Sequence, residues 1–501
     1  MRIGGLASGM DIDQIIADMM SVRRLPLDKL TQQRQRLEWQ QEDYRAINKQ
    51  LFSLRESVFS LKLQGTFNVK SAFSSNEDIV QVSAGGNALN GTYKIAVKQL
   101  AEGAFKTSSA PLGSTDDYST LSTQLEGLKG EIKFSINDQE FTVNTETESI
   151  YDLMNKINKA DIGVQASYDR NLDRFFLSTT GTGENAQIEI VGGAYQSEEG
   201  EKNFFEDILN IDTGVVKGKN AEFTLNGAEF TMASNEFTIN GISYSLKGLS
   251  PTGADGEPVA ASVSVKSDTE KIFDTIMDFV NLYNETIDKI NGKLFEKYYR
   301  DYPPLTDAMR EQLDDDQIEK WMEKARSGLL RNDSMLSGIV SQMRTAIYGV
   351  VEGVSGEYNS LASIWITTGD YSERGKLHVN EDKLREAIAK DPEGIKELFT
   401  ATSADGSSKN EGIASRLYNE VVAGISKVTE KAGIESEFSL VDESVIGKRI
   451  KDMDDRIEDY EDRLKMIEDR YWRQFTAMEK AINQMNSQSM WLMQQFSMGK
   501  G

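Results

Sequence analysis

The C-terminal end of the chain carries an apolar repeat that fits one long helix. Its apolar residues recur alternately three and four positions apart, with one polar member, Ser489. The repeat comprises Ile446, Ile450, Met453, Ile457, Tyr460, Leu464, Ile467, Tyr471, Phe475, Met478, Ile482, Met485, Leu492 and Phe496. This spacing lines one face of a helix. Neither proline nor glycine occurs between Lys448 and Ser497, so a single helix of about 77 Å is predicted.

This narrow apolar seam needs a partner, because most helical stability in proteins comes from packing of the apolar face. A strict three-and-four repeat favours another helix as that partner, as in a coiled coil. A core helix of an ordinary domain is the alternative. No charged residue lies between Lys480 and Lys500. An uncharged end avoids repulsion between copies of an acidic protein, so we expect the end of the helix to be buried only in an assembly.

The N-terminal end also predicts helix, over residues 11–64. Ile12, Ile15 and Met19 begin an apolar stripe with Asp11 as its cap. Pro26 is expected to interrupt the stripe, as a first-turn residue of the next segment. A second stripe follows with Tyr44, Ile47, Leu51, Leu54, Val58 and Leu61. The stripes at the two chain ends have no partner nearby in the sequence, so we expect both ends in one helical stalk. Three separate domains in a row are the alternative.

The middle of the chain predicts strands, from about residue 70 to 265. Short β-type runs occur at 79–82, 92–97 and 132–136. Asn90-Gly91, Asn226-Gly227 and Asn240-Gly241 are typical of tight hairpins, because both residues tolerate positive φ. The sequence Glu-Phe-Thr-Leu-Asn-Gly at 222–227 returns as Glu-Phe-Thr-Ile-Asn-Gly at 236–241, which favours two similar hairpins over a functional repeat. One helix, 150–158, is predicted within this region, with Ser149 as its cap.

Helix resumes at about 269 and covers much of 305–350 and 380–400. The fold class is therefore predicted as multidomain α+β, with a coiled-coil stalk formed by both termini and a β-rich head inserted between them. We expect four domains. They are terminal helices (1–40 with 440–501), a helical stalk domain (41–70 with 268–439), a β-rich head domain (71–115 with 216–267) and a second, inserted β-rich domain (116–215).

Composition excludes several classes of function. The chain has 501 residues with 56 Lys and Arg against 80 Asp and Glu, a formal charge of −24. Nucleic-acid binders need positive charge, so nucleic acid is not an expected partner. No apolar run reaches membrane-spanning length and no continuous apolar stretch follows Met1, so neither membrane insertion nor a cleaved signal peptide is expected.

The usual signatures of catalysis and metal binding are missing. The chain has no cysteine and one histidine, His378, which we expect in a strand or loop. Asp314-Asp315-Asp316 lacks the glycine and spacing of a calcium loop and reads as an acidic helix end. Gly5-Leu6-Ala7-Ser8-Gly9 is not a nucleophile elbow. The prediction is a structural protein with no cofactor, no metal and no catalytic residues.

Both ends resemble the flagellar hook-associated protein 2 family, the filament cap proteins. The opening motif is Ile3-Gly4-Gly5-Leu6-Ala7-Ser8-Gly9-Met10-Asp11, and residues 471–480, 485–488 and 491–492 are similar to the C-terminal signature. Residues 361–398 resemble the helical domain of the family, and 164–169 resembles a small β motif of flagellar axial proteins.

The resemblance implies a cap at the distal tip of the bacterial flagellum, outside the cell. It implies a ring-shaped homo-oligomer, with a pentamer favoured, under which exported flagellin subunits fold and insert. It also implies contact with hook–filament junction proteins, export by the flagellar type III apparatus, and a cytoplasmic chaperone on the C-terminal helix. The seam residues above, with Ile12, Ile15 and Met19, are the expected assembly residues.

Two other functions stay open at this stage. A tip adhesin would use the β-rich head to bind host glycans or mucin, and this is compatible with a cap. A different axial junction protein is the other alternative. We also expect the two terminal seams to lack partners within one molecule and to become ordered only when copies assemble.

Overall fold

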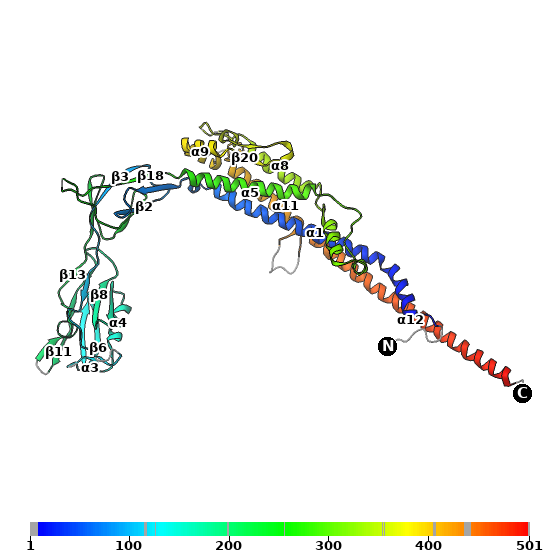
Figure 1. Cartoon of the computed structure of the whole chain (residues 1–501), viewed down its shortest axis with the longest axis horizontal. Coiled ribbons are helices and arrows are strands. Elements are labelled where there is room, and N and C mark those ends of the chain that lie inside the picture. Colours follow the sequence, from blue (N-terminus) through cyan, green and yellow to red (C-terminus); the bar gives the residue numbers. More distant parts are fainter. Residues whose placement is uncertain are drawn as a thin grey trace. The chain divides into compact units, whose positions relative to one another are not determined.

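The computed structural model describes residues 9–114, 118–125, 127–197, 200–254, 256–352, 354, 356–403, 407–434 and 442–498. The chain divides into two compact units. Residues 1–67 and 269–501 form the first unit, and residues 68–268, inserted between them in the sequence, form the second. Long helices dominate the first unit and strands the second, which confirms the predicted α+β class (Figure 1).

The first unit is helical, and its two longest helices come from the two chain ends. Its helices are α1 (Ile12–Lys62), α2 (Gln64–Phe67), α5 (Thr269–Phe295), α6 (Asp307–Arg310), α7 (Asp315–Arg326), α8 (Ser334–Tyr348), α9 (Glu381–Lys390), α10 (Pro392–Thr400), α11 (Ile413–Ala432) and α12 (Val445–Met498). Two short 3₁₀ turns, Ala362–Ile364 and Tyr371–Glu373, accompany a hairpin of β19 (Ile366–Thr368) and β20 (Leu377–Val379).

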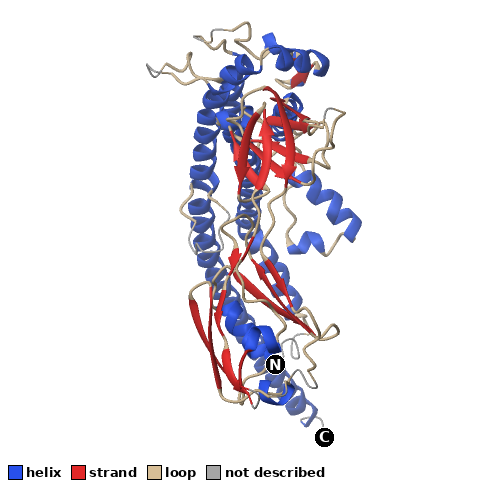
Figure 2. Ribbon diagram, turned by 90° about the vertical axis from the view of Figure 1, so that its left-hand side faces the viewer, coloured by secondary structure: helices blue, strands red, loops and turns tan. Residues whose placement is uncertain are grey.

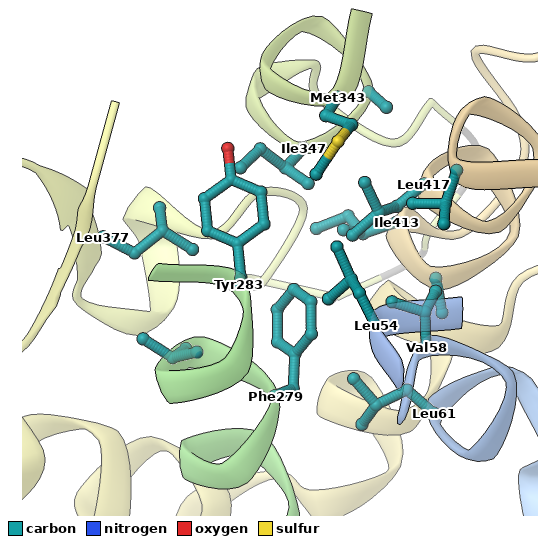
Figure 3. Close-up of a cluster of buried hydrophobic side chains, with 14 of the residues drawn as sticks. Leu54, Val58, Leu61, Phe279, Tyr283, Met343, Ile347, Leu377, Ile413 and Leu417 are labelled. Carbon is teal, nitrogen blue, oxygen red and sulfur yellow. The ribbon is translucent and has the colours of Figure 1, made fainter. Parts of the chain in front are cut away.

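The core of this unit lies where α1, α5, α8 and α11 meet. The apolar stripe predicted on α1 is buried throughout, from Tyr44 to Leu61. Figure 3 shows Leu54, Val58 and Leu61 facing side chains of α5, α8 and α11 across this core. Burial of each such side chain stabilises the fold by about 1.5–3 kcal/mol, so this core anchors the helical unit.

One expectation about these helices was wrong, and one helix was not predicted. Pro26 lies inside α1, which continues through it. A proline in a helix removes one backbone hydrogen bond, and a helix that is packed along its length tolerates that loss. Helix α11 was not among the predicted helices, although its buried Val421, Ile425 and Val428 carry the four-and-three spacing of an amphipathic helix.

The second unit contains two apolar cores, and the first is a β-sandwich. A five-stranded sheet, β1-β18-β3-β14-β15, and a three-stranded sheet, β16-β17-β2, share the core. The strands are β1 (Lys70–Ser74), β2 (Val80–Ala84), β3 (Gly91–Gln99), β14 (Ala221–Leu225), β15 (Ala228–Met232), β16 (Glu236–Ile239), β17 (Ile242–Leu246) and β18 (Ala261–Ser267).

Two of the three predicted hairpins are confirmed. Asn226 and Asn240 have φ of 52° and each is followed by a glycine with positive φ, in the turns β14–β15 and β16–β17. The repeated sequence therefore forms two similar hairpins, and their Phe223 and Phe237 rings stack 4.6 Å apart. The predicted hairpin at Asn90-Gly91 was wrong. Gly91 begins β3 within the larger sheet, while β2 pairs only with β17 in the smaller one.

The second core combines short sheets with one helix. Its elements are β4 (Phe105–Thr107), α3 (Leu121–Gln124), β5 (Glu131–Ile136), β6 (Gln139–Asn144), α4 (Ile150–Lys159), β7 (Val164–Asp169), β8 (Arg174–Thr179), β9 (Gln187–Ile188), β10 (Ile190–Gly192), β11 (Ala194–Ser197), β12 (Gly200–Asn203), the π-turn Phe204–Ile208 and β13 (Val216–Lys217). Helix α4 is the predicted one, and Ser149 caps it in a capping box with Asp152. Figure 2 shows the strands of this unit in red.

Helix α4 also covers two sheet edges. Lys156 Nζ donates to the carbonyl of Thr142 on β6 (2.8 Å), and the Asn158 amide makes both backbone hydrogen bonds of Ala166 on β7 (2.7 and 3.0 Å). Edge strands with open backbone groups recruit foreign strands. These side chains occupy such groups within the chain itself.

The finer division of the chain into four domains stays a prediction.

Candidate assembly interface

Helices α1 and α12 lie side by side and run antiparallel (Figure 1). Polar pairs fix their register. Arg34 Nε donates to Asp454, and both Gln41 (2.6 Å) and Arg45 (2.8 Å) donate to Asp442 just before α12 begins. The Asp11 side chain caps α1 by accepting from Gln14 N (3.0 Å), as the sequence predicted. The two chain ends therefore form one stalk.

Asp442 holds the start of α12 in place. Partial burial alone would raise the pKa of its carboxyl group. The hydrogen bonds from Ser444 (backbone N to Oδ1, 2.9 Å) and the charge of Arg45 outweigh burial, so the pKa of Asp442 is lowered. The lowered pKa favours the ionised carboxylate, which links α1 to the residues just before α12.

An apolar cluster closes the outer part of the helix pair. Ile12, Ile16 and Met20 of α1 are buried against Leu464 and Tyr471 of α12. Leu27, Tyr460, Ile467, Trp472 and Phe475 are half-buried around them. The expectation that both seams lack a partner within one molecule was therefore wrong up to Phe475. The two seams pack against each other. This partner was not predicted, because it lies more than 400 residues away along the chain.

The predicted assembly residues at the N-terminus fall on two different faces of α1. Ile12 is buried against α12, whereas Ile15 is half-buried and Met19 is 37% exposed. The buried stripe continues through Ile16 and Met20 instead. Ile15 and Met19 begin a second stripe, spaced four and three, that continues to Val22, which is 65% exposed. We call Ile15, Met19 and Val22 the outer stripe.

The predicted residues of α12 divide along its length. Ile446 and Ile450 join the core of the helical unit, and Met453 and Ile457 are half-buried. Tyr460 to Phe475 belong to the cluster with α1. Beyond it, Ile482 is half-buried while Met478, Met485 and Leu492 are exposed, and the side chain of Phe496 lies outside the described residues. Whether this set makes contacts between copies stays a prediction.

The last turns of α12 form an exposed helix that we call the tail, residues 476–498. In Figure 1 it continues past the first turn of α1. Met485 (68%), Trp491 (58%) and Met493 (70%) are among its exposed side chains. Met490 and Trp491 were not among the predicted assembly residues, because they lie off the three-and-four repeat. Their exposure is visible only once the partner of the seam is known.

A further segment of the chain packs on α1 next to the helix pair. Residues 296–332, which we call the clamp, include α6 and α7. Gln32 Nε2 donates to the carbonyl of Pro304 (2.7 Å), Gln40 Nε2 to that of Leu329 (3.1 Å), and Arg326 pairs with Glu42 (2.6 Å). Within the clamp, Trp321 Nε1 donates to the carbonyl of Pro303 (2.8 Å). These bonds hold the clamp beside α1.

A buried carboxylate lies under the clamp. Asp43 of α1 pairs with Lys293 of α5 (3.0 Å) and lies 3.8 Å from Arg326. Burial raises the pKa of Asp43, and the hydrogen bond and charge of Lys293 oppose it. Removing one partner of a buried ion pair is costly, so this contact favours one position of the clamp.

The described residues offer no other site with recognisable chemistry. Among them, no group of His, Asp and Glu side chains is placed to hold a metal ion, and no helix combines the length and apolar character that crossing a bilayer requires. Asp314 is the N-cap of α7, in a capping box with Gln317, as an acidic helix end should be. His378 lies in β20 and pairs with Glu373 (2.7 Å), which confirms its expected place in a strand.

Comparisons with known proteins agree with this architecture. Two family models match, the flagellar hook-associated protein 2 N-terminus over residues 8–104 and the flagellar hook-associated protein 2 C-terminus over residues 218–487. The flagellar hook-associated protein 2 of Halalkalibacterium halodurans is 33% identical, over 99% of this chain and 100% of the relative. That of Escherichia coli K12 is 27% identical, over 98% and 97%.

A solved structure shows the same fold. The crystal structure of the flagellar cap protein FliD D1-D2-D3 domains from Escherichia coli matches 82% of this chain and 99% of its own, with a TM-score of 0.54 and 22% identity. A relative above 30% identity that spans the whole chain, together with matches to both ends, shows the family. The chain belongs to the flagellar hook-associated protein 2 family.

Proposed function

We propose that this chain is the structural cap at the distal end of the bacterial flagellar filament. It works as a ring-shaped homo-oligomer, with a pentamer favoured, and promotes the folding and insertion of exported flagellin. Its role is mechanical, with no enzymatic step and no cofactor. Family membership supports this role, and so does the name of the related Escherichia coli protein, a flagellar cap protein.

The observation that carries the proposal is the apolar surface at the free end of the stalk. The outer stripe of α1 and the exposed Met and Trp side chains of the tail lie on the helices of the two chain termini. Exposed large apolar side chains that recur along neighbouring helices mark an interaction surface. Five or so copies could each cover the stripe of a neighbour.

The energetics favour contacts that form and break. Full burial of one large apolar side chain contributes about 1.5–3 kcal/mol. The tail is already helical, so association avoids most of the backbone ordering cost of about 1–2 kcal/mol per residue. A few side chains per copy then give a weak contact, which suits a cap that must move as subunits are added beneath it.

The proposed partners follow from the position of the cap. Flagellin and the hook–filament junction proteins are the neighbours within the filament. A cytoplasmic chaperone covers the apolar face of α12 before export through the flagellar type III apparatus, and the protein acts outside the cell. The comparisons give no support to the adhesin alternative, so no second function is proposed.

Two matched substitutions test the proposal. Val22→Asp places a charge in the outer stripe, and Val422→Asp does the same on α11, where the side chain is 40% exposed. Both variants would be purified for electron microscopy and used to complement a strain that lacks the gene. We expect Val22→Asp to abolish rings and to leave flagellin unpolymerised in the medium. The Val422→Asp variant should form rings and filaments. Normal filaments with Val22→Asp would overturn the proposed interface.

A further inference from the structure

A groove lies beside the stalk on the helical unit, with a volume of about 730 Å³. Helix α1 lines one side from Asp13 to Gln35, the clamp residues Pro304 to Arg310 line the second, and Glu461, Glu468 and Trp472 of α12 line the third. Leu27 and Trp472, both half-buried, supply apolar surface within it, next to the buried Ile16, Met20 and Leu305. The volume fits a row of side chains presented by a helix lying along α1.

The length of the groove matches the length of the tail. Asp13 and Gln35 are separated by about 33 Å along α1 at 1.5 Å per residue. The tail, residues 476–498, has the same length by the same rule. A helix lying along α1 could therefore contact the groove over its whole extent.

The charges around the groove are mainly acidic. Its charged lining comprises five acids (Asp13, Asp28, Asp307, Glu461 and Glu468) and two arginines (Arg24 and Arg310). Burial raises the pKa of Asp28, Arg24 opposes this effect, and Asp307 adds to it. An acidic helix would be repelled here. The tail carries no charged residue after Lys480 until Lys500, so it enters without that penalty.

The tail cannot reach the groove of its own chain. Because α1 and α12 are antiparallel, Phe475 lies near the first turn of α1, and α12 continues from there without a break to Met498. Folding the tail back along α1 would require a turn within this helix. The occupant must therefore come from another copy.

We propose that the tail of one copy docks in the groove of a neighbouring copy, between α1 and the clamp. Exposed tail side chains such as Met485, Trp491 and Met493 pack there against the half-buried Leu27 and Trp472. This inference rests on the proposed self-assembly and deepens it, because it gives the clamp a role. The clamp forms one wall of a receptor for the neighbouring tail.

Cysteine cross-linking tests this contact directly, since the chain has no cysteine of its own. A full-length Ala17→Cys copy, with the cysteine in the groove, is mixed with a differently tagged Ser489→Cys copy, with the cysteine on the tail. A short bis-maleimide then joins only different chains. Ala46→Cys is the matched control, because Ala17 and Ala46 are both exposed alanines of α1 and only Ala17 lines the groove.

The expected result is oligomers by mass photometry and cross-linking of the Ala17→Cys pair at least tenfold faster than that of the Ala46→Cys pair. Oligomers with equal rates for both pairs would overturn the groove contact and leave the cap proposal standing. A protein that stays monomeric at all concentrations would overturn the cap proposal and the groove contact with it. A parallel comparison of Ala17→Glu with Ala46→Glu should show weaker association only for the first.

Discussion

Leu464→Ala should open the end of the stalk without disturbing the helical core. Leu464 is 6% exposed and packs in the cluster of Ile12, Ile16 and Met20. Truncating a buried leucine to alanine lowers the free energy of unfolding by about 2–5 kcal/mol. Its neighbours Tyr460 and Ile467 are only half-buried and can move to fill the space, so we expect a loss of about 2 kcal/mol, at the low end of that range.

Hydrogen exchange on dilute monomer measures this loss where it occurs. Local opening of the helix pair should become about 30-fold more frequent, since each 1.36 kcal/mol corresponds to a factor of ten. Amides of α1 from residue 15 to 27 should exchange faster by that factor. Amides near Leu54 and Leu61 belong to a separate core and should be unaffected.

Leu492→Ala is the control, because it is the same substitution in the same helix at a side chain that is 48% exposed. It should leave exchange in α1 unchanged in the monomer. Equal protection of residues 15–27 in the native protein and the Leu464→Ala variant would refute the reasoning, because the cluster would then not hold the two ends together. An equal effect of both substitutions would refute it as well.

Three further predictions concern other parts of the chain. Burial alone would raise the pKa of Asp442, but hydrogen bonds from Ser444 and the charge of Arg45 lower it. The ionised group therefore stabilises the fold above its unfolded pKa of about 3.9, and this contribution is lost as pH falls through the folded pKa. Asp442→Asn should lower the urea midpoint at pH 7 and leave it unchanged near pH 2. Gly241→Ala should destabilise the β-sandwich more than Gly227→Ala in urea titrations, because both have positive φ but only a Cβ at Gly241 would lie 2.5 Å from another side-chain atom. Phe223→Ala should cost about 3–5 kcal/mol of sandwich stability in the same assay, since the ring is buried; a loss below 1 kcal/mol would contradict its place in the core.

The long C-terminal helix was predictable because one repeat determines both its structure and its buried face. Residues 446–475 are spaced for one seam, and the structure packs that seam against core or α1. The α4 helix and the hairpins at Asn226 and Asn240 were predictable for a similar reason. Each depends on a few adjacent residues with strong conformational preferences.

Periodicity did not predict which face of α1 is buried. Its first turns carry two apolar stripes, one through Ile12, Ile16 and Met20 and one through Ile15 and Met19. Both have helical spacing, and only the tertiary contact with α12 selects the first. The hairpin expected at Asn90 failed for the same kind of reason. The turn sequence is present, but β2 and β3 on either side of it pair with other strands and lie in different sheets.

The sequence predicted helix within the clamp, but neither the place of the clamp beside α1 nor the groove had a sequence signal. The hydrogen bonds that position the clamp go from Gln32 and Gln40 to backbone carbonyls about 270 to 290 residues away. Side-chain-to-backbone contacts of this kind leave no pattern in either segment. They appear only when the fold brings the two segments together.

The pairing of the first and last helices has a consequence for the order of folding. Ile12 and Leu464 are separated by most of the polypeptide, so neither can cover the other until α12 has been synthesised. Segments that contact a neighbour close by in the sequence, such as the hairpins of the inserted unit, can form while the rest of the chain is still being synthesised. The outermost part of the stalk is therefore the final region to close, and a copy shortened at either end would keep its apolar seam open.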